Sequence, residues 1–242
     1  MRTVAIVQAR MGSSRLPGKV LLELGGTTML ACVVARLRAA HSISDIVIAT
    51  STAQLDDAIV HEASRLDTKI HRGSEDDVLS RYLGAARATA AEAVVRVTAD
   101  CPLLDPGVVD DVVAALTPDF DYASNTQTRT YPRGLDVEAM HRDTLERIGR
   151  LGTSRAAREH VTAFVTEHPA LFQIAQVTTT EDASDLRWTV DTAEDLELVR
   201  MLYAALDLRA PRDYREIVAE MRAHPHLASI NSHVVQKPLH VA

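Results

Sequence analysis

A stretch of small and cationic residues, Q-A-R-M-G-S-S-R-L-P-G-K at 8–19, directly follows an apolar run near the start of the chain. Its glycine and serines can turn backbone N–H groups inward as a nest for an anion, and its cations supply the charge that a triphosphate requires. These residues are Arg10, Gly12, Ser13, Ser14, Arg15 and Lys19. The segment therefore predicts a phosphate cradle.

This segment is not a P-loop. Five residues rather than four separate Gly12 from Gly18, and Val20 stands where a P-loop carries the Ser or Thr that binds the metal. The segment also lacks the G-x-G-x-x-G spacing of a dinucleotide-binding turn. The alternative interpretation is a flexible basic loop, because surface loops often carry Gly, Ser and Lys without binding anything.

Two aspartates end apolar stretches further along the chain: Asp100 in T-A-D-C-P-L-L-D-P and Asp191 in R-W-T-V-D. Each of them alone is well explained as a helix N-cap, since Asp at a strand-to-helix junction accepts orphan N–H groups. Their convergence on one sheet edge favours a Mg²⁺ site, because one or two carboxylates suffice for a nucleotide-bound ion. Asp105, before Pro106, is interpreted as a purely structural N-cap.

A third junction, H-R-G-S-E-D-D-V-L-S-R-Y at 71–82, offers a turn with a cation followed by acidic residues. Capping alone could explain it. Ser74 and Asp77 have the spacing of a capping box, and acidic residues suit the positive end of a helix.

The elements that must position these residues alternate between buried strands and amphipathic helices, which predicts a doubly wound α/β fold with a mostly parallel nucleotide-binding sheet. We expect strands at 3–8, 45–50, 68–71, 93–98, 121–124, 135–140, 172–178 and 187–190. We expect helices near 29–37, 53–66, 75–91, from 106 onward, and at 143–150, 156–168, 193–206 and 213–223.

The whole chain, 1–242, is predicted to be a single domain. The regular alternation of strands and helices changes after Pro118, so the region at about 119–170 is interpreted as a small insertion for acceptor binding or dimerisation. A polar tail is expected from 224 to 242.

The composition excludes several classes of protein. A net charge of -7 without a Lys/Arg cluster argues against a nucleic-acid binder. No apolar run reaches membrane-spanning length, and the first one is too short for a signal peptide. Cys32 and Cys101 lack metal or redox spacing and fit a reducing compartment. We therefore expect a cytoplasmic protein.

The segment from Arg10 to Lys19 resembles the signature of the acylneuraminate and Kdo cytidylyltransferases, and in particular their SpsF-like branch. That branch typically shows R-G-S-E-x-D-V-L-x-R-Y, R-V-T-G-D-C-P-L-I-D-P, P-R-G-L-D-V-E, R-E-H-V-T and T-V-D-T-x-E-D. This chain carries counterparts, in the same order, at 72–82, 96–106, 132–138, 158–162 and 189–195. Five motifs in one order are far more specific than any single one. The match spans residue 4 to about residue 200.

The resemblance implies a nucleotide-diphospho-sugar transferase-like fold, Mg²⁺ as cofactor, a homodimer, and transfer of CMP from CTP to an acidic sugar in polysaccharide precursor synthesis. It implies catalytic roles for Lys19, Arg15 and Asp100, with Asp100 and Asp191 holding the metal. The implied nucleotide-binding residues are Gln8, Ala9, Arg10, Gly12, Ser13, Ser14, Arg72, Gly73, Ser74, Thr98 and Ala99. The implied acceptor-binding residues are Arg133, Asp136, Glu138, Arg158 and His160; a dimer interface or local capping explains those residues equally well.

Two departures from the family pattern bear on the base. Ala99 replaces the branch's usual Gly, and Thr98 stands where the Kdo enzymes carry a Gln that touches the nucleotide. The identity of the base is therefore less well determined than the reaction type.

Two other functions remain open from the sequence. A glycosyltransferase with a nucleotide-sugar donor would use a similar sheet and metal carboxylates, although three cations suit a triphosphate better than a diphosphate sugar. A noncatalytic nucleotide-binding partner could retain the fold, although the joint presence of Lys19, Asp100 and Asp191 argues against it.

Overall fold

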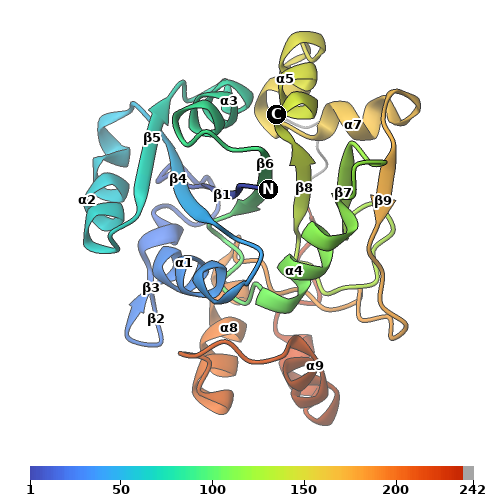
Figure 1. Ribbon diagram of the computed structural model, residues 1–242. Coiled ribbons are helices and arrows are strands. Elements are labelled where there is room, and N and C mark those ends of the chain that lie inside the picture. The colour runs from blue at the N-terminus through green and yellow to red at the C-terminus, as the bar shows by residue number, and fades with distance from the viewer. Residues whose placement is uncertain (237–242) are drawn as a thin grey trace.

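Seven strands form one sheet in the order β5-β4-β1-β6-β8-β7-β9 in the computed structural model, which describes residues 1–236 (Figure 1). Strand β8 pairs antiparallel with β6 and β7, whereas the other neighbours in the sheet pair in parallel. The strands of this sheet are β1 (Thr3–Gln8), β4 (Asp45–Ser51), β5 (Lys69–Gly73), β6 (Ala93–Thr98), β7 (Tyr122–Ser124), β8 (Glu138–His141) and β9 (Ile174–Gln176). A separate small hairpin pairs β2 (Glu23–Leu24) with β3 (Thr27–Thr28). The predicted mostly parallel α/β sheet is confirmed.

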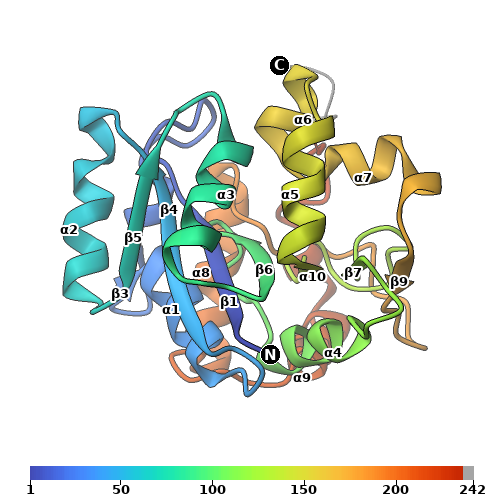
Figure 2. The same ribbon diagram turned by 45° about the horizontal axis from the view of Figure 1, so that its top comes forward.

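Helices cover both faces of the sheet (Figures 1 and 2). One core cluster joins the sheet to α1, α4, α8 and α9, and the other joins it to α3, α5, α6 and α7. The helices are α1 (Met29–Ala39), α2 (Asp57–Arg65), α3 (Val78–Ala88), α4 (Pro106–Ala115), α5 (Arg142–Leu151), α6 (Arg155–His160), α7 (Ala163–Glu167), α8 (Ala193–Leu206), α9 (Tyr214–Ala223) and α10 (Pro225–Ser229). Short 3₁₀ turns are η1 (Lys19–Leu21), η2 (Gln54–Asp56) and η3 (Pro169–Leu171).

The central strand β1 shows why these apolar runs form strands. Val4 and Ile6 enter one core cluster, while Ala5 and Val7 enter the other, and all four are fully buried. Successive side chains of a strand point to opposite faces, so a run that is apolar at every position must be covered on both sides. The helix layers supply that cover.

The parallel strands end at one edge of the sheet. Gln8 at the end of β1 pairs in register with Thr98 at the end of β6, and Ser51 of β4 pairs with Gly73 of β5. Ligands of open α/β sheets bind at this carboxyl edge, so the loops that follow these four residues are the expected site.

Three predicted elements differ in the structure. Residues 187–190 form no strand but only an isolated bridge between Arg187 and Arg133. The reason is that their amides are bound irregularly: Trp188 N and Thr189 N both donate to Arg133 O. The predicted helix at 156–168 is split into α6 and α7 at Val161, whose φ of 55° no right-handed helix accommodates.

The predicted helix at 75–91 begins later, at Val78, with Asp77 as its N-cap and Ser80 N as the donor to that carboxylate. Ser74 Oγ accepts from Asp77 N, before the helix begins. By contrast, Asp105 caps α4 before Pro106, as predicted.

The region at about 119–170 supplies β7, β8, α5, α6 and α7. Its two strands join the main sheet, and Tyr122, Met140 and Leu145 belong to the core under α3. This region is therefore packed as part of the sheet.

The predicted polar tail contains α10, where Pro225 occupies the first turn and Leu227 is buried. The last six residues of that predicted tail, 237–242, lie outside the described part of the chain. Both cysteines are free and buried, as predicted for ordinary thiols. Within residues 1–236, no helix has the length and apolar character needed to cross a membrane.

Candidate active site

The loop after β1 is folded by its own backbone and by a neighbouring carboxylate. Gly18 N donates to Met11 O at 3.0 Å, and Gly18 has a φ of 69°, which favours glycine. Met11 N donates to Asp56 Oδ1 at 2.7 Å, and Leu16 N donates to Ser13 Oγ at 3.3 Å. The loop thus turns back on itself over the carboxyl edge of the sheet.

Lys19 brings three distant segments together. Its Nζ lies 2.7 Å from Asp100 Oδ2, 2.7 Å from Asp191 Oδ1 and 2.9 Å from Val190 O. Asp100 follows β6, and Asp191 precedes α8. The convergence predicted for the two carboxylates is therefore present, and a cation lies between them.

Asp191 is held by two further cations. Its Oδ2 lies 2.9 Å from Arg15 and 2.8 Å from Arg187. Arg187 also donates to Asp195, which is the N3 residue of a capping box with Thr192 at the start of α8. The side chain of Asp191 is consequently fixed from two sides.

Charge pairing outweighs burial at this cluster. Burial disfavours the charged form of Lys19, but the carboxylates of Asp100 and Asp191 raise its pKa overall. Burial likewise opposes ionisation of Asp191, yet Lys19, Arg15 and Arg187 lower its pKa. Both groups are therefore charged at neutral pH.

These groups line a cavity of about 220 Å³. Every lining residue except Val20 is among those predicted from the sequence. The lining consists of Gln8, Arg10, Gly12, Ser13, Ser14, Arg15, Lys19, Val20, Thr98, Ala99, Asp100 and Asp191. The phosphate cradle and the carboxylates predicted from the sequence thus surround one cavity.

The second predicted nucleotide segment lies beside this cavity rather than in its lining. Arg72 donates from Nε to Ser51 O at 2.9 Å and pairs with Asp57 at 2.7 Å, so it holds the loop after β4. Gly73 O accepts from Thr52 N. Ala9 is buried in the core.

The two predicted acceptor-binding carboxylates, Asp136 and Glu138, have internal ion pairs and are not among the residues that line the Lys19 cavity. Asp136 pairs with Arg129, whose Nη1 lies 2.6 Å from Asp136 Oδ1. Glu138 is buried, pairs with Arg96 and accepts from Tyr122 Oη. Glu138 therefore links β8 to β6 and β7, whereas Asp136 fixes the loop before β8.

The remaining three predicted acceptor-binding residues lie at different places. Arg133 lines a separate hollow with Arg187, which pairs with Asp191 of the Lys19 cavity. Arg158 pairs with Asp77, donates to Gly149 O at 3.3 Å and lines a hollow of about 560 Å³ that also includes Arg10. His160 ends α6. Of these residues, Arg158 has the closest link to the loop after β1, through the hollow that it shares with Arg10.

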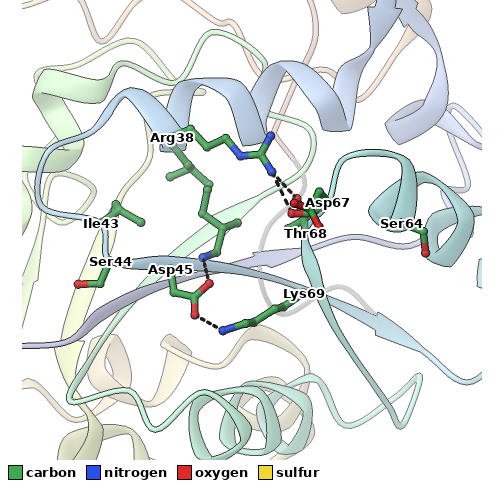
Figure 3. A pocket seen from close by; sticks show the side chains of 10 residues that line it. Arg38, Ile43, Ser44, Asp45, Ser64, Asp67, Thr68 and Lys69 are labelled. Carbon is green, nitrogen blue, oxygen red and sulfur yellow. Dashed lines mark hydrogen bonds and ion pairs between the residues drawn. The ribbon is translucent and has the colours of Figure 1, made fainter.

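A larger hollow of about 600 Å³ lies at the opposite edge of the sheet (Figure 3). Asp45 and Lys69, which begin β4 and β5, form an ion pair there, and Arg38 donates to the backbone of Asp67 (Figure 3). Because open α/β sheets bind ligands at the other end of their strands, the Lys19 cavity is the better candidate despite its smaller volume.

The carboxylates suit a magnesium ion. Within residues 1–236, no three His, Cys, Asp or Glu side chains are grouped so that they could hold a metal. Mg²⁺ is instead bound through one or two carboxylates plus substrate phosphates and water. Asp100 and Asp191 fit this pattern, since both reach the same Nζ and remain partly exposed.

Two residues that hold Asp191, Arg187 and Asp195, are not among those predicted from the sequence. Arg187 falls in the predicted strand at 187–190, and Asp195 belongs to a family motif without a predicted role. The signal that could have found them is the capping-box spacing of Thr192 and Asp195, which places a buried carboxylate under the turn that carries Asp191.

Arg81 is another residue to which the sequence assigns no role. It is fully buried, and none of its three guanidinium nitrogens has a hydrogen-bond partner within residues 1–236. Burial lowers its pKa. Its Cγ would lie 2.8 Å from a Cβ at Gly73, so it packs directly beneath the second nucleotide segment.

Comparison with known proteins places this geometry in a family. The cytidylyltransferase family model matches residues 4–223. An uncharacterised protein of Methanocaldococcus jannaschii is 35% identical over 98% of this chain and 97% of its own. The spore coat polysaccharide biosynthesis protein SpsF of Bacillus subtilis is 33% identical over 93% of this chain and 95% of its own.

A solved structure shows the same architecture. A cytidylyltransferase from Leptospira borgpetersenii superposes with a TM-score of 0.90 at 30% identity, covering 94% of this chain and 97% of that one. The SpsF-like resemblance and the nucleotidyltransferase fold predicted from the sequence are both confirmed. The chain belongs to the cytidylyltransferase family and is a nucleotidyltransferase.

Proposed function

We propose that this enzyme transfers CMP from CTP to an acidic sugar or a related acceptor, with Mg²⁺ bound and pyrophosphate released. The observation that carries this proposal is the contact of one ammonium group, Lys19 Nζ, with both Asp100 and Asp191 beside a phosphate-binding loop. A basic loop and two carboxylates are the complement that a metal-bound triphosphate requires.

In the proposed reaction, an acceptor hydroxyl attacks the α-phosphorus of CTP and the bond to the bridging β-oxygen breaks. The protein acts mainly by positioning the reactants and stabilising charge. Lys19 and Arg15 bind the triphosphate and stabilise the leaving pyrophosphate, while the backbone around Gly12 and Ser13 orients its oxygens. Asp100 and Asp191 would hold Mg²⁺, which would neutralise negative charge on the phosphates.

The base and ribose are assigned to the edge formed by Gln8, Thr98 and the segment 72–74. Arg158 is the acceptor-binding candidate with the best support, because it shares a hollow with Arg10 of the phosphate loop. We propose that the product is a precursor for surface polysaccharide or glycoconjugate synthesis in the cytoplasm, by analogy with the role that the name of SpsF gives to that protein.

We further propose a homodimer formed through the region at about 119–170. Leu151 and Leu171 of this region are about half exposed, at 49% and 53%. Light scattering of the purified protein tests this point. A mass of twice the 26.4 kDa chain supports the dimer, and a mass of one chain contradicts it.

Pyrophosphate release tests the reaction. Each of the four nucleoside triphosphates is combined with Mg²⁺ and a panel of acidic sugars, and the wild type is compared with Lys19→Ala. Lys69→Ala is the matched control, because this exposed lysine pairs with Asp45 at the opposite edge of the sheet.

We expect release with CTP and one class of acidic sugar, loss of release in Lys19→Ala, and full activity in Lys69→Ala. Binding of nucleotide-sugars without pyrophosphate release from any pair would overturn the proposal in favour of glycosyl transfer. Release with ATP, GTP or UTP in preference to CTP would refute the assignment of the base.

A further inference from the structure

The segment after α10 contacts Arg187 and Asp195, the two residues that hold the predicted metal ligand Asp191. Asn231 is 3% exposed, and its Nδ2 donates to Asp195 Oδ1 at 2.9 Å and to Arg187 O at 3.0 Å. Both partners can only accept hydrogen bonds, so the amide nitrogen must face them. Five residues later, Gln236 Oε1 accepts from Arg187 Nη1 at 2.7 Å.

Asp195 is the centre of this arrangement. Its carboxylate is fully buried and accepts from Arg187 Nε and Nη2, from the backbone N–H groups of Asp191 and Thr192, and from Asn231. It therefore fixes the backbone of Asp191, while Arg187 fixes the side chain of Asp191 at 2.8 Å. Asn231 is the donor to Asp195 that comes from the C-terminal segment.

This contact lies outside the segment that defines the family. The family match ends at residue 223, before α10, whereas Asn231 and Gln236 follow α10. The segment belongs to the predicted polar tail, yet Asn231 is as buried as a core residue. A buried amide whose nitrogen donates to both members of one ion pair is placed to orient that pair.

We infer that Asn231 is a positioning residue for the metal-binding carboxylate Asp191, acting through Asp195 and Arg187. The inference rests on the proposed magnesium site. Without the Asn231 amide, the buried oxygen of Asp195 loses one donor and the Arg187 carbonyl loses its contact with the C-terminal segment. Asp191 is then held less rigidly. Groups that contact a metal ligand directly typically change metal affinity by about 10–100-fold when removed, so a smaller, several-fold change is expected for Asn231, which contacts those groups.

Binding of Mn²⁺, a spin-active substitute for Mg²⁺, tests the inference directly. Free Mn²⁺ is measured by electron paramagnetic resonance in titrations of the full chain, with and without CTP. The variants are Asn231→Ala, which removes the donor, and Asn231→Asp, which places an acceptor against two acceptors. Ser232→Ala is the control, because this exposed neighbour bonds only within its own turn, to Ser229 O.

We expect the Mn²⁺ dissociation constant to rise several-fold in Asn231→Ala, to rise further in Asn231→Asp, and to stay unchanged in Ser232→Ala. Excess metal should restore the transfer rate of Asn231→Ala, with the KM for CTP unchanged at saturating metal. A residue that served only stability would lower the melting temperature without this metal rescue.

Gln236→Ala covers the case in which Asn231→Ala fails to fold. Gln236 is exposed, so its removal leaves the core intact, and a few-fold weaker Mn²⁺ binding is expected. Tight Mn²⁺ binding by the wild type together with unchanged binding by folded Asn231→Ala and Gln236→Ala would overturn the inference. No Mn²⁺ binding by the wild type, even with CTP, would instead overturn the proposed metal site and the inference with it.

Discussion

Asp100 Oδ2 lies 2.7 Å from Lys19 Nζ, although 81 residues separate the two in the chain. The parallel pairing of β1 with β6 produces this contact, because it brings the loops that follow both strands to the same edge of the sheet. The same Nζ also reaches Asp191, so a single cation links the two carboxylates assigned to the metal. This arrangement and its surroundings can be tested by substitution.

Replacing Lys19 by Ala should lower the rate of pyrophosphate release about 100-fold, equivalent to on the order of 3 kcal/mol in the barrier, because one preorganised charge at the leaving group is lost. Steady-state kinetics at saturating CTP and Mg²⁺ provide the measurement. Lys69→Ala should retain the full rate. A loss of less than about threefold in Lys19→Ala would show that the ammonium group has no part in the transition state.

Replacing Asp191 by Asn should reduce stability at neutral pH by about 2 kcal/mol, since hydrogen bonds from charged donors to a carboxylate are lost. The pKa of Asp191 is lowered in the folded protein by Lys19, Arg15 and Arg187 against the opposing effect of burial. A carboxyl with a depressed folded pKa contributes stability above its unfolded value, near 3.9, and loses it as the pH falls through the folded value.

The stability gap between wild type and Asp191→Asn should therefore be full at about pH 6–7 and should narrow below about pH 4. Urea unfolding at a series of pH values measures this gap. A gap that stayed constant down to about pH 2.5 would mean that the carboxylate charge does not cause it.

Replacing Arg81 by Met should stabilise the protein by about 1 kcal/mol or more, because it removes a buried guanidinium that has no hydrogen-bond partner among residues 1–236 and keeps its apolar stem. Arg36→Met is the matched comparison. Arg36 is equally buried, but it donates to the carbonyls of Leu104 and Leu208.

We expect Arg36→Met to lower stability by about 1–3 kcal/mol, since it leaves two buried acceptors unpaired. Thermal melts of both variants without ligand show whether each substitution raises or lowers the stability. Equal destabilisation by both substitutions would show that the Arg81 guanidinium is compensated, for example by buried water.

Replacing Gly134 by Ala should destabilise the protein by more than about 3 kcal/mol and lower activity. Gly134 has a φ of 110°, and a Cβ there would lie 2.5 Å from Thr189 N. The displaced segment leads to Asp191 two residues later. Gly26→Ala separates the effect of backbone strain from that of the close contact. Gly26 also has a positive φ, of 88°, but nothing lies within 4 Å of its Cβ position.

Gly26→Ala should cost only the backbone strain, about 1–2 kcal/mol, and should leave activity intact. Denaturant unfolding and pyrophosphate release of both variants are compared. Similar losses at the two glycines would contradict a specific close approach between residues 134 and 189.

Much of this protein is determined by its sequence alone. Apolar runs such as 3–8 and 93–98 must be covered on both faces, which requires a parallel sheet between helix layers. Residues that directly follow such strands fall on one edge, so sequence pattern suffices to predict that the loop at 8–19 and Asp100 share one site. The order Asp105-Pro106 likewise suffices to predict that Asp105 caps the helix that follows.

Other features were decided only by tertiary structure. Residues 187–190 have the composition of a strand, but the amides of Trp188 and Thr189 both bind the single carbonyl of Arg133. Glu138 lies in a motif shared with the family, yet pairing of β6 with β8 sets it beside Arg96 in the core. Local pattern cannot reveal such partners, because they depend on which strands become neighbours.

The last example is Asn231. Nothing in the polar segment around it signals burial, since a lone asparagine has neither periodicity nor cap spacing to distinguish it. Its place is set by the docking of the C-terminal segment on Arg187 and Asp195, two residues more than thirty positions away in the chain. Sequence thus determined which residues carry the charge of this site, whereas the tertiary structure decided which residues hold them in place.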